Sequence, residues 1–325
     1  MTNSTYSSTT PASSVVVVNP NKAAGTSAGQ PANSAGPIDS GSRVGAPPVS
    51  ATPVAYPGAS PGSPVAVQRE RDTEVVWNVP FDRLDMSQSI DAIGELVAQD
   101  RPSYVVTANL NYCMLHDQDE SVREITRDAD LVLADGQPIV WRSQLDGNPL
   151  PERVAGSEMI IHLCERAAKE GWRVYFLGGA EGVAETCATR LQADFPGLQV
   201  AGTECPPFRQ LTDQEHAEQL ARIRYAETDL LFVAFGQPKG EKWIRENLSS
   251  LGNACCIQLG ASFDFIAGTA VRAPEAYQKF GMEWAYRMAS DPKRLVPRYA
   301  GNGWFLAKAL LRDWQRQVKS WGMWD

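Results

Sequence analysis

The stretch Asp130-Leu-Val-Leu-Ala-Asp135-Gly136 decides the fold. Its four consecutive apolar residues indicate a short strand that is buried on both faces, as the strands of parallel sheets are. The run ends in a carboxylate and a glycine, and open parallel α/β sheets bind ligands outside the carboxyl ends of their strands. Asp135 is therefore a candidate catalytic base. The alternative is that Asp135 caps a helix beginning near Gln137 and Pro138, because Asp favours helix N-caps and proline favours the first turn.

Strand and helix patterns alternate from about residue 72 to residue 271. The patterns indicate a β-like segment at 74–79 and strands at 103–107, 172–177, 198–202, 229–235 and 254–259. Apolar residues at helical spacing predict helices at 86–99, through 114–125, at 154–171 with Ser157 as its cap, and at 213–226. This alternation predicts an α/β, Rossmann-like fold with a doubly wound parallel sheet, right-handed crossovers and a site along the carboxyl edge.

Glycine-rich turns follow two of the predicted strands. Gly178 and Gly179 lie between a strand and a helix, where backbone N–H groups can approach an anionic ligand at the positive end of the helix. This turn has neither a Walker A sequence nor a full GxGxxG pattern, so a tight turn without a ligand is the alternative. The other turn, Gly236-Gln-Pro-Lys239-Gly-Glu241, also precedes a helix.

The first 70 residues have the composition of a disordered chain. Residues 1–68 are mainly Ser, Thr, Pro, Gly, Ala and Val, they carry only Lys22, Asp39 and Arg43 as charged side chains, and they show no periodicity. The apolar run at 15–18 is far shorter than the roughly 20 residues that cross a bilayer, and no basic segment leads into it. We expect a disordered tail at 1–70, no export signal, a sheet domain at 71–271 and a helical appendage at 272–325.

Charge, cysteines and histidines narrow the functional classes. The formal net charge of −8 argues against a general nucleic-acid binder. The six cysteines have no CxxC or Cys/His spacing and lie mostly in apolar periodic segments, which favours free thiols in a reducing compartment. His116, His162 and His216 lie on predicted helices without metal-ligand spacing. We expect neither a metal site nor a cofactor.

The segment from Arg272 to Asp325 is basic although the whole chain is acidic. It holds ten Lys or Arg residues against five Asp or Glu residues, a net charge of about +5, and five tryptophans from Trp284 to Trp324. Basic helices with tryptophan on an apolar face suit the interface of an anionic membrane. For some of these aromatic residues, packing in the core or in an oligomer interface is the alternative.

A set of motifs in chain order resembles one family of enzymes. The motifs are Thr107-Ala-Asn109, Ala134-Asp135-Gly136, Arg153-Val-Ala-Gly156-Ser, Phe176-Leu-Gly178-Gly179, Phe235-Gly-Gln-Pro238-Lys239-Gly-Glu241-Lys-Trp243, Gly260-Ala-Ser-Phe263-Asp264-Phe-Ile-Ala-Gly268, Arg272-Ala-Pro274, Gly281-Met-Glu283-Trp284-Ala-Tyr286-Arg287 and Pro292-Lys-Arg294-Leu. From about Val75 to Trp314 the combination resembles the WecG/TagA/CpsF glycosyltransferase family, and no single motif is specific by itself.

The resemblance implies an activity and a set of site residues. It implies inverting transfer of a hexose or N-acetylhexosamine, usually of the N-acetylmannosamine type, from a UDP-sugar to an undecaprenyl diphosphate-linked saccharide in cell-surface polysaccharide synthesis. It also implies a cytoplasmic enzyme, peripheral on the inner face of the cell membrane, whose C-terminal helices complete the site. Asp135 then corresponds to the base, with Thr107 and Asn109 beside it. The implied substrate-binding residues are Arg153, Gly178, Gly179, Gly236, Gln237, Lys239, Glu241, Asp264, Arg272, Arg287 and Arg294.

One position departs from the pattern of this family. The loop of the family usually reads Gly-x-Pro-Lys/Arg-Gln-Glu, whereas position 240 here is glycine. Gln237 is a candidate to supply the missing amide.

Inversion by direct displacement needs a base for the acceptor hydroxyl and charges that stabilise the leaving diphosphate. A DxD motif of the kind that holds a divalent cation is not evident, because Asp128-Ala-Asp130 precedes its strand. We therefore expect Arg153, Lys239 and helix N-termini to meet the leaving charge.

Two other functional classes stay open from the residues alone. A dinucleotide-binding oxidoreductase or epimerase would use the Gly178-Gly179 turn, which lacks both the full glycine pattern and an acidic ribose partner about 20 residues further on. A non-catalytic membrane scaffold would have no need of polar residues at the strand ends. The expected partners are a UDP-sugar, a lipid-linked sugar acceptor and an anionic membrane, and we expect no binding to nucleic acid. The sequence leaves open whether the protein forms a homo-oligomer.

Overall fold

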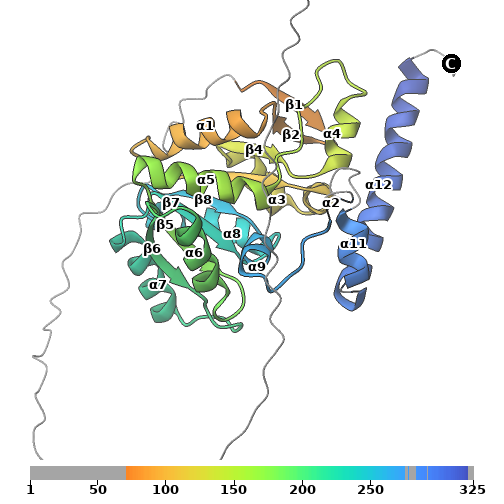
Figure 1. Ribbon diagram of the computed structural model, residues 1–325. Helices are drawn as coiled ribbons and strands as arrows, with labels where there is room; N and C mark the ends of the chain where they lie inside the picture. Colours follow the sequence, from red (N-terminus) through yellow and green to blue (C-terminus); the bar gives the residue numbers. More distant parts are fainter. Residues whose placement is uncertain (1–70, 275–276, 278–282, 291, 321–325) are drawn as a thin grey trace, which may run out of the picture. The chain divides into compact units, whose positions relative to one another are not determined.

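A six-stranded, all-parallel sheet with the strand order β4–β3–β8–β7–β5–β6 forms the centre of the fold (Figure 1). The computed structural model describes residues 71–274, 277, 283–290 and 292–320, so the predicted tail at 1–70 lies outside the described residues. The strands are β3 (Ser103–Ala108), β4 (Leu131–Ala134), β5 (Arg173–Gly178), β6 (Gln199–Glu204), β7 (Leu230–Ala234) and β8 (Cys255–Gln258). The predicted α/β fold with a parallel sheet is confirmed.

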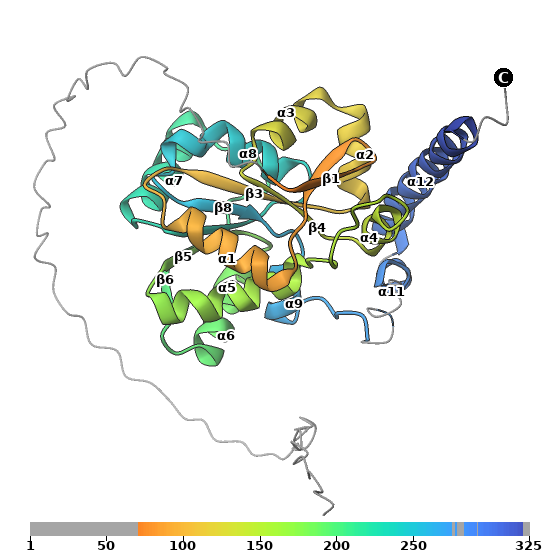
Figure 2. The same ribbon diagram turned by 90° about the horizontal axis from the view of Figure 1, so that it is seen from above.

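Helices cover both faces of this sheet (Figure 2). On one face lie α2 (Leu110–Gln118), α3 (Glu120–Asp128), α7 (Asp213–Tyr225) and α8 (Lys239–Asn247), which is followed by the short 3-10 helix Leu248–Ser250. On the other face lie α1 (Met86–Val97), α5 (Gly156–Glu170), α6 (Val183–Asp194) and α9 (Ser262–Ala267). Successive strand residues point to opposite faces, so the two sides of each strand except β6 enter an apolar core, whereas the edge strand β6 is only partly buried. This double burial explains why the buried strands are largely apolar.

An antiparallel hairpin precedes the sheet, where the sequence indicated one β-like segment at 74–79. It consists of β1 (Thr73–Val76) and β2 (Val79–Asp82). The chain reverses at Trp77 and Asn78, whose φ angles of 51° and 69° fit a two-residue hairpin turn. The Trp77 ring packs edge-on against Phe305, with ring centroids 5.9 Å apart. The hairpin turn is thereby attached to the C-terminal part of the chain.

Two helix predictions were wrong in detail. The single helix predicted through 114–125 is two helices, because Asp119 has an extended backbone and accepts a hydrogen bond from Ser121 N at 2.9 Å as the cap of α3. The long helix α5 begins after Ala155 without a side-chain cap. Ser157 is therefore a residue of its first turn and not its cap.

The C-terminal helices are α11 (Glu283–Ser290) and α12 (Pro292–Ser320). Phe305 and Ala309 of α12 are buried in the same core cluster as one face of the sheet. Arg142 of α4 (Gln137–Ser143) donates two hydrogen bonds to Asp313, at 2.7 and 3.1 Å. The predicted C-terminal helix is confirmed, and it packs on the body of the protein. No helix among the described residues has the length and apolar character that crossing a bilayer requires.

Candidate active site

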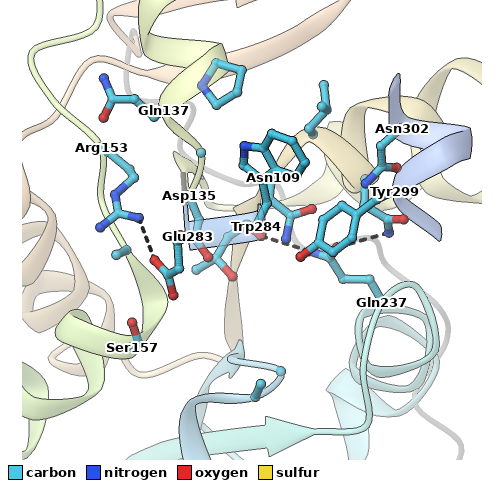
Figure 3. Close-up of a pocket in the computed structure, with 18 of the residues that line it drawn as sticks. Asn109, Asp135, Gln137, Arg153, Ser157, Gln237, Glu283, Trp284, Tyr299 and Asn302 are labelled. Carbon is cyan, nitrogen blue, oxygen red and sulfur yellow. Dashed lines mark hydrogen bonds and ion pairs between the residues drawn. The ribbon is translucent and has the colours of Figure 1, made fainter. Parts of the chain in front are cut away.

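A cavity of about 940 Å³ lies at the carboxyl ends of β3, β4, β7 and β8, between these strand ends and the C-terminal helices (Figure 3). This is the edge at which ligands of parallel α/β sheets bind. The residues predicted from sequence that line it are Thr107, Asn109, Asp135, Arg153, Gly236, Gln237 and Asp264. Residues from separate strands and loops are thus brought together in one cavity.

Asp135 lines the cavity directly after β4. Its backbone N–H donates to Ala108 O at 2.9 Å, which continues the pairing of β3 and β4 past the end of the strand. The N-cap residue of α4 is Gly136, so Asp135 does not hold that position. A Cβ atom at Gly156 would lie 3.7 Å from Asp135 Oδ2, which places the carboxylate beside the first turn of α5.

Thr107 and Asn109 follow one another at the end of β3, and both also hold the local structure. The Thr107 hydroxyl donates to Gln258 O at 2.9 Å and so links β3 to β8. The Asn109 side-chain oxygen accepts a hydrogen bond from Tyr112 N at 3.2 Å and caps α2. Both residues line the cavity next to Asp135, and these bonds fix their side chains there.

Arg153 reaches the cavity from the segment between α4 and α5. Its guanidinium pairs with Glu283 of α11 at 3.3 Å (Figure 3) and with Glu158 of α5 at 3.5 Å. Glu158 also pairs with Arg272 at 2.5 Å, and Arg272 itself does not line the cavity. The side chain of Arg153 is 18% exposed, so a cation with restricted access to water stands at one side of the cavity. A guanidinium in this setting can bind two oxygens of a phosphate group.

The loop between β7 and α8 contributes Gly236 and Gln237 to the cavity. Gln237 Nε2 donates to Thr107 O at 3.1 Å, and Gln237 Oε1 accepts from Asn111 Nδ2 at 3.3 Å. Lys239 and Glu241 do not line the cavity. The Lys239 ammonium lies 5.8 Å from the ring centroid of Phe235, and Glu241 is buried. The Gln237 amide thus joins this loop to the end of β3 at the edge of the cavity.

Gly240, the position that departs from the family pattern, lies against a buried side chain. A Cβ atom at Gly240 would be 2.2 Å from Gln258 Oε1 and 3.1 Å from Gln258 Cγ. Gln258 is 2% exposed. Position 240 therefore has no room for a larger residue unless Gln258 moves.

The remaining predicted site residues lie in the turn after β5, in α9, and on the two C-terminal helices α11 and α12. Gly178 and Gly179 do not line the cavity; their φ angles are 108° and 82°, and a Cβ atom at Gly178 would lie 2.9 Å from Ala234 O. The turn after β5 therefore requires glycine for its conformation and its packing. Asp264 lines the cavity and accepts a hydrogen bond from Thr269 Oγ1 at 3.1 Å. Arg287 and Arg294 lie on α11 and α12, and the positions of their side chains are outside the described residues.

The C-terminal helices supply cavity residues that the sequence did not assign to the site. They include Glu283 and Trp284 of α11 and Tyr299 and Asn302 of α12 (Figure 3). On α12 the lining residues recur at spacings of three and four, which places them on one helical face: Leu295, Tyr299, Asn302, Leu306 and Leu310. This periodicity is visible in the sequence, but the sequence does not say that the face covers the strand ends.

Among the described residues, no cysteine or histidine lines the cavity. All six cysteines are free and five are buried, and burial raises the pKa of Cys187 and of Cys255 to about 12. The predicted free thiols are confirmed. Across the described ranges, no group of three or more His, Cys, Asp or Glu side chains is arranged to hold a metal ion.

The fold and the cavity define an α/β protein with a carboxylate, Asp135, and a guanidinium, Arg153, in one cavity at the carboxyl edge of its sheet. Residues 74–319 match the glycosyl transferase WecG/TagA/CpsF family. The chain belongs to this family and is a glycosyltransferase. Membership sets aside the oxidoreductase and scaffold alternatives.

Several relatives share one name, N-acetylglucosaminyldiphosphoundecaprenol N-acetyl-beta-D-mannosaminyltransferase. The protein from Bacillus spizizenii is 31% identical over 206 residues, which are 62% of this chain and 78% of that protein. The protein from Bacillus subtilis is 28% identical over 234 residues, 70% of this chain and 90% of that protein. The protein from Staphylococcus aureus is 28% identical over 225 residues, with shares of 68% and 85%.

Proposed function

We propose that the chain transfers N-acetylmannosamine, or a related hexose, from its UDP-sugar to a saccharide on undecaprenyl diphosphate, with inversion at the donor carbon. The observation that carries the proposal is the presence of Asp135 and Arg153 in one cavity of a chain of this family. The relatives' name specifies a β-mannosaminyl group and a diphosphoundecaprenol acceptor. A β-linked product from an α-linked nucleotide sugar requires inversion, which supports direct displacement.

In this mechanism Asp135 takes the proton of the acceptor hydroxyl as its oxygen attacks the donor carbon. The bond from that carbon to the UDP oxygen breaks, and its electron pair stays with the diphosphate. Arg153 stabilises the developing charge, together with arginines of the C-terminal helices. Thr107 and Asn109 form the wall beside the reacting hydroxyl. We propose that these protein cations suffice and that no divalent metal ion is needed.

The direct test combines a donor screen with an Asp135→Asn variant. A short-chain lipid diphosphate sugar acceptor is incubated with a panel of UDP-sugars, and UDP-N-acetylmannosamine is expected to react fastest. Asp135→Asn should lower turnover by about 10² to 10⁴. Asp128→Asn is the matched control, because Asp128 is a surface carboxylate paired with Arg245 at 2.8 Å. Near-normal turnover of the Asp135→Asn variant would remove this residue from the mechanism.

Loss of activity in EDTA that magnesium or manganese restores would refute metal independence.

We further propose that the outer face of α12 binds an anionic membrane surface at which the lipid-linked acceptor resides. On this face Trp304, Leu311 and Trp314 are 66%, 53% and 60% exposed, and the Lys308 ammonium lies 4.9 Å from the ring centroid of Trp304. Exposed tryptophan and lysine together suit the headgroup region. The test is sedimentation with anionic vesicles at low and high salt. A Trp304→Ser, Trp314→Ser double variant should lose binding, and equal sedimentation of variant and wild type would refute the membrane role.

A further inference from the structure

The cavity that contains Asp135 extends beyond the strand ends into an apolar arm between α4 and α12. We define this apolar arm by six lining residues: Trp141 of α4, Leu145 in the turn after α4, Trp284 of α11, and Leu295, Leu306 and Leu310 of α12. Both ribbon views place α4 beside α12 (Figures 1 and 2). The polar half of the cavity, with Asp135 and Arg153, is continuous with this arm.

Four of the six side chains that define the apolar arm are exposed, those of Trp141, Leu145, Trp284 and Leu310. Trp141 is 49% exposed, Leu145 is 62% exposed and Leu310 is 47% exposed. Isolated apolar side chains on a surface are ordinary, but a group of them around one cavity marks a binding site. Arg142 also lines the cavity here, and its guanidinium is already paired with Asp313 and Asp146. A ligand in the arm therefore meets apolar surface and a neutralised cation.

We propose that the apolar arm binds the first isoprenoid units of a polyprenyl diphosphate acceptor. This inference rests on the proposed function, because that function requires one molecule to place a sugar hydroxyl at Asp135 while its lipid chain is attached through a diphosphate. Apolar surface within the same cavity is where such a chain can begin. Beyond Leu310, the exposed side chains of Leu311 and Trp314 continue the apolar surface along α12. The arm thus offers an apolar path from the cavity to the outer face of that helix.

The test measures binding of prenyl monophosphates, without donor and without transfer. Geranyl, farnesyl and geranylgeranyl monophosphate are titrated into the full-length protein, with inorganic phosphate as the reference, and tryptophan fluorescence reports occupancy because Trp141 and Trp284 line the arm. Leu310→Glu should weaken farnesyl monophosphate binding about tenfold, since it places a charge where the chain lies. Val296→Glu is the matched control: Val296 also lies on α12, is 45% exposed against 47% for Leu310, and does not line the cavity. Circular dichroism and urea midpoints establish that both variants fold.

Affinity that rises with chain length and is lost only in the Leu310→Glu variant would support the apolar arm. Equal affinity for all probes and inorganic phosphate, or equal weakening by the two variants, would overturn it. The readout is separate from the proposed function. Prenyl binding with no transfer from any UDP-sugar would reject the activity and keep the arm, whereas transfer with the same acceptor KM in wild type and Leu310→Glu would keep the activity and reject the arm.

Discussion

The contact that fixes α12 to the body of the protein predicts a measurable loss of stability on changing one atom. Asp313 accepts two hydrogen bonds from Arg142, at 2.7 and 3.1 Å, and one from Trp77 Nε1 at 3.2 Å. The side chains of Arg142 and Asp313 are 13% and 10% exposed. The variant Asp313→Asn keeps the shape of the side chain, removes its charge and leaves one acceptor oxygen in place of two.

The expected cost follows from the burial of this pair. Removing one partner of a buried ion pair costs about 3 to 5 kcal/mol, and charge-assisted hydrogen bonds contribute roughly 1.5 to 3 kcal/mol each. Arg142 keeps Asp146 as a partner at 2.5 Å, which reduces the penalty of leaving its charge buried. We therefore expect Asp313→Asn to lower the free energy of unfolding by about 2 to 3 kcal/mol.

The assay is urea unfolding of the full-length protein at neutral pH, followed by circular dichroism. Asp117→Asn is the control. Asp117 of α2 pairs with Arg312 of α12 at 3.3 Å, but the side chains of Asp117 and Arg312 are 30% and 45% exposed. Such an exposed pair contributes at most about 1 kcal/mol. If the two variants unfold at the same urea concentration, the Arg142–Asp313 pair does not stabilise the docking of α12, and the reasoning from burial fails.

Two further predictions concern charge. Burial alone would raise the pKa of Asp313, but the hydrogen bonds from Arg142 outweigh it and hold that pKa below its usual value. The stabilisation that the ionised Asp313 gives the folded protein is therefore present above about pH 4 and is lost as the pH falls through the lowered pKa. The wild type should accordingly lose more unfolding free energy on acidification than the Asp313→Asn variant, as urea unfolding at several pH values would show. Glu283→Gln should tighten UDP binding about three- to tenfold in calorimetric titrations, because it removes the carboxylate that competes with the diphosphate for Arg153. Glu158→Gln is the control for the second variant, since Glu158 also pairs with Arg153 but does not line the cavity. Weaker UDP binding by Glu283→Gln would instead show that Glu283 contacts the donor.

The strand-end half of the site could be predicted because it follows from local patterns. Asp135 and Asn109 each end an apolar run, and a parallel sheet brings the carboxyl ends of its strands to one edge. The helical half could not be predicted, since it depends on contacts between distant residues. Trp77 and Asp313 are 236 residues apart in the chain, and their hydrogen bond has no local signature. The hairpin turn could not be predicted for a different, local reason. Trp77 adopts a positive φ, which tryptophan rarely does, so the sequence at the turn does not have the usual turn residues.

The packing of Gly240 against Gln258 makes the evolutionary histories of these two positions interdependent. A glutamine introduced alone at position 240 would meet the buried Gln258 side chain at 2.2 Å from its first carbon. Overpacking of this kind typically costs about 1 to 3 kcal/mol. The effect of a substitution at one position thus depends on the residue at the other, which is epistasis between the loop after β7 and the end of β8. A lineage can exchange the glycine for glutamine at low cost only after, or together with, a change at position 258.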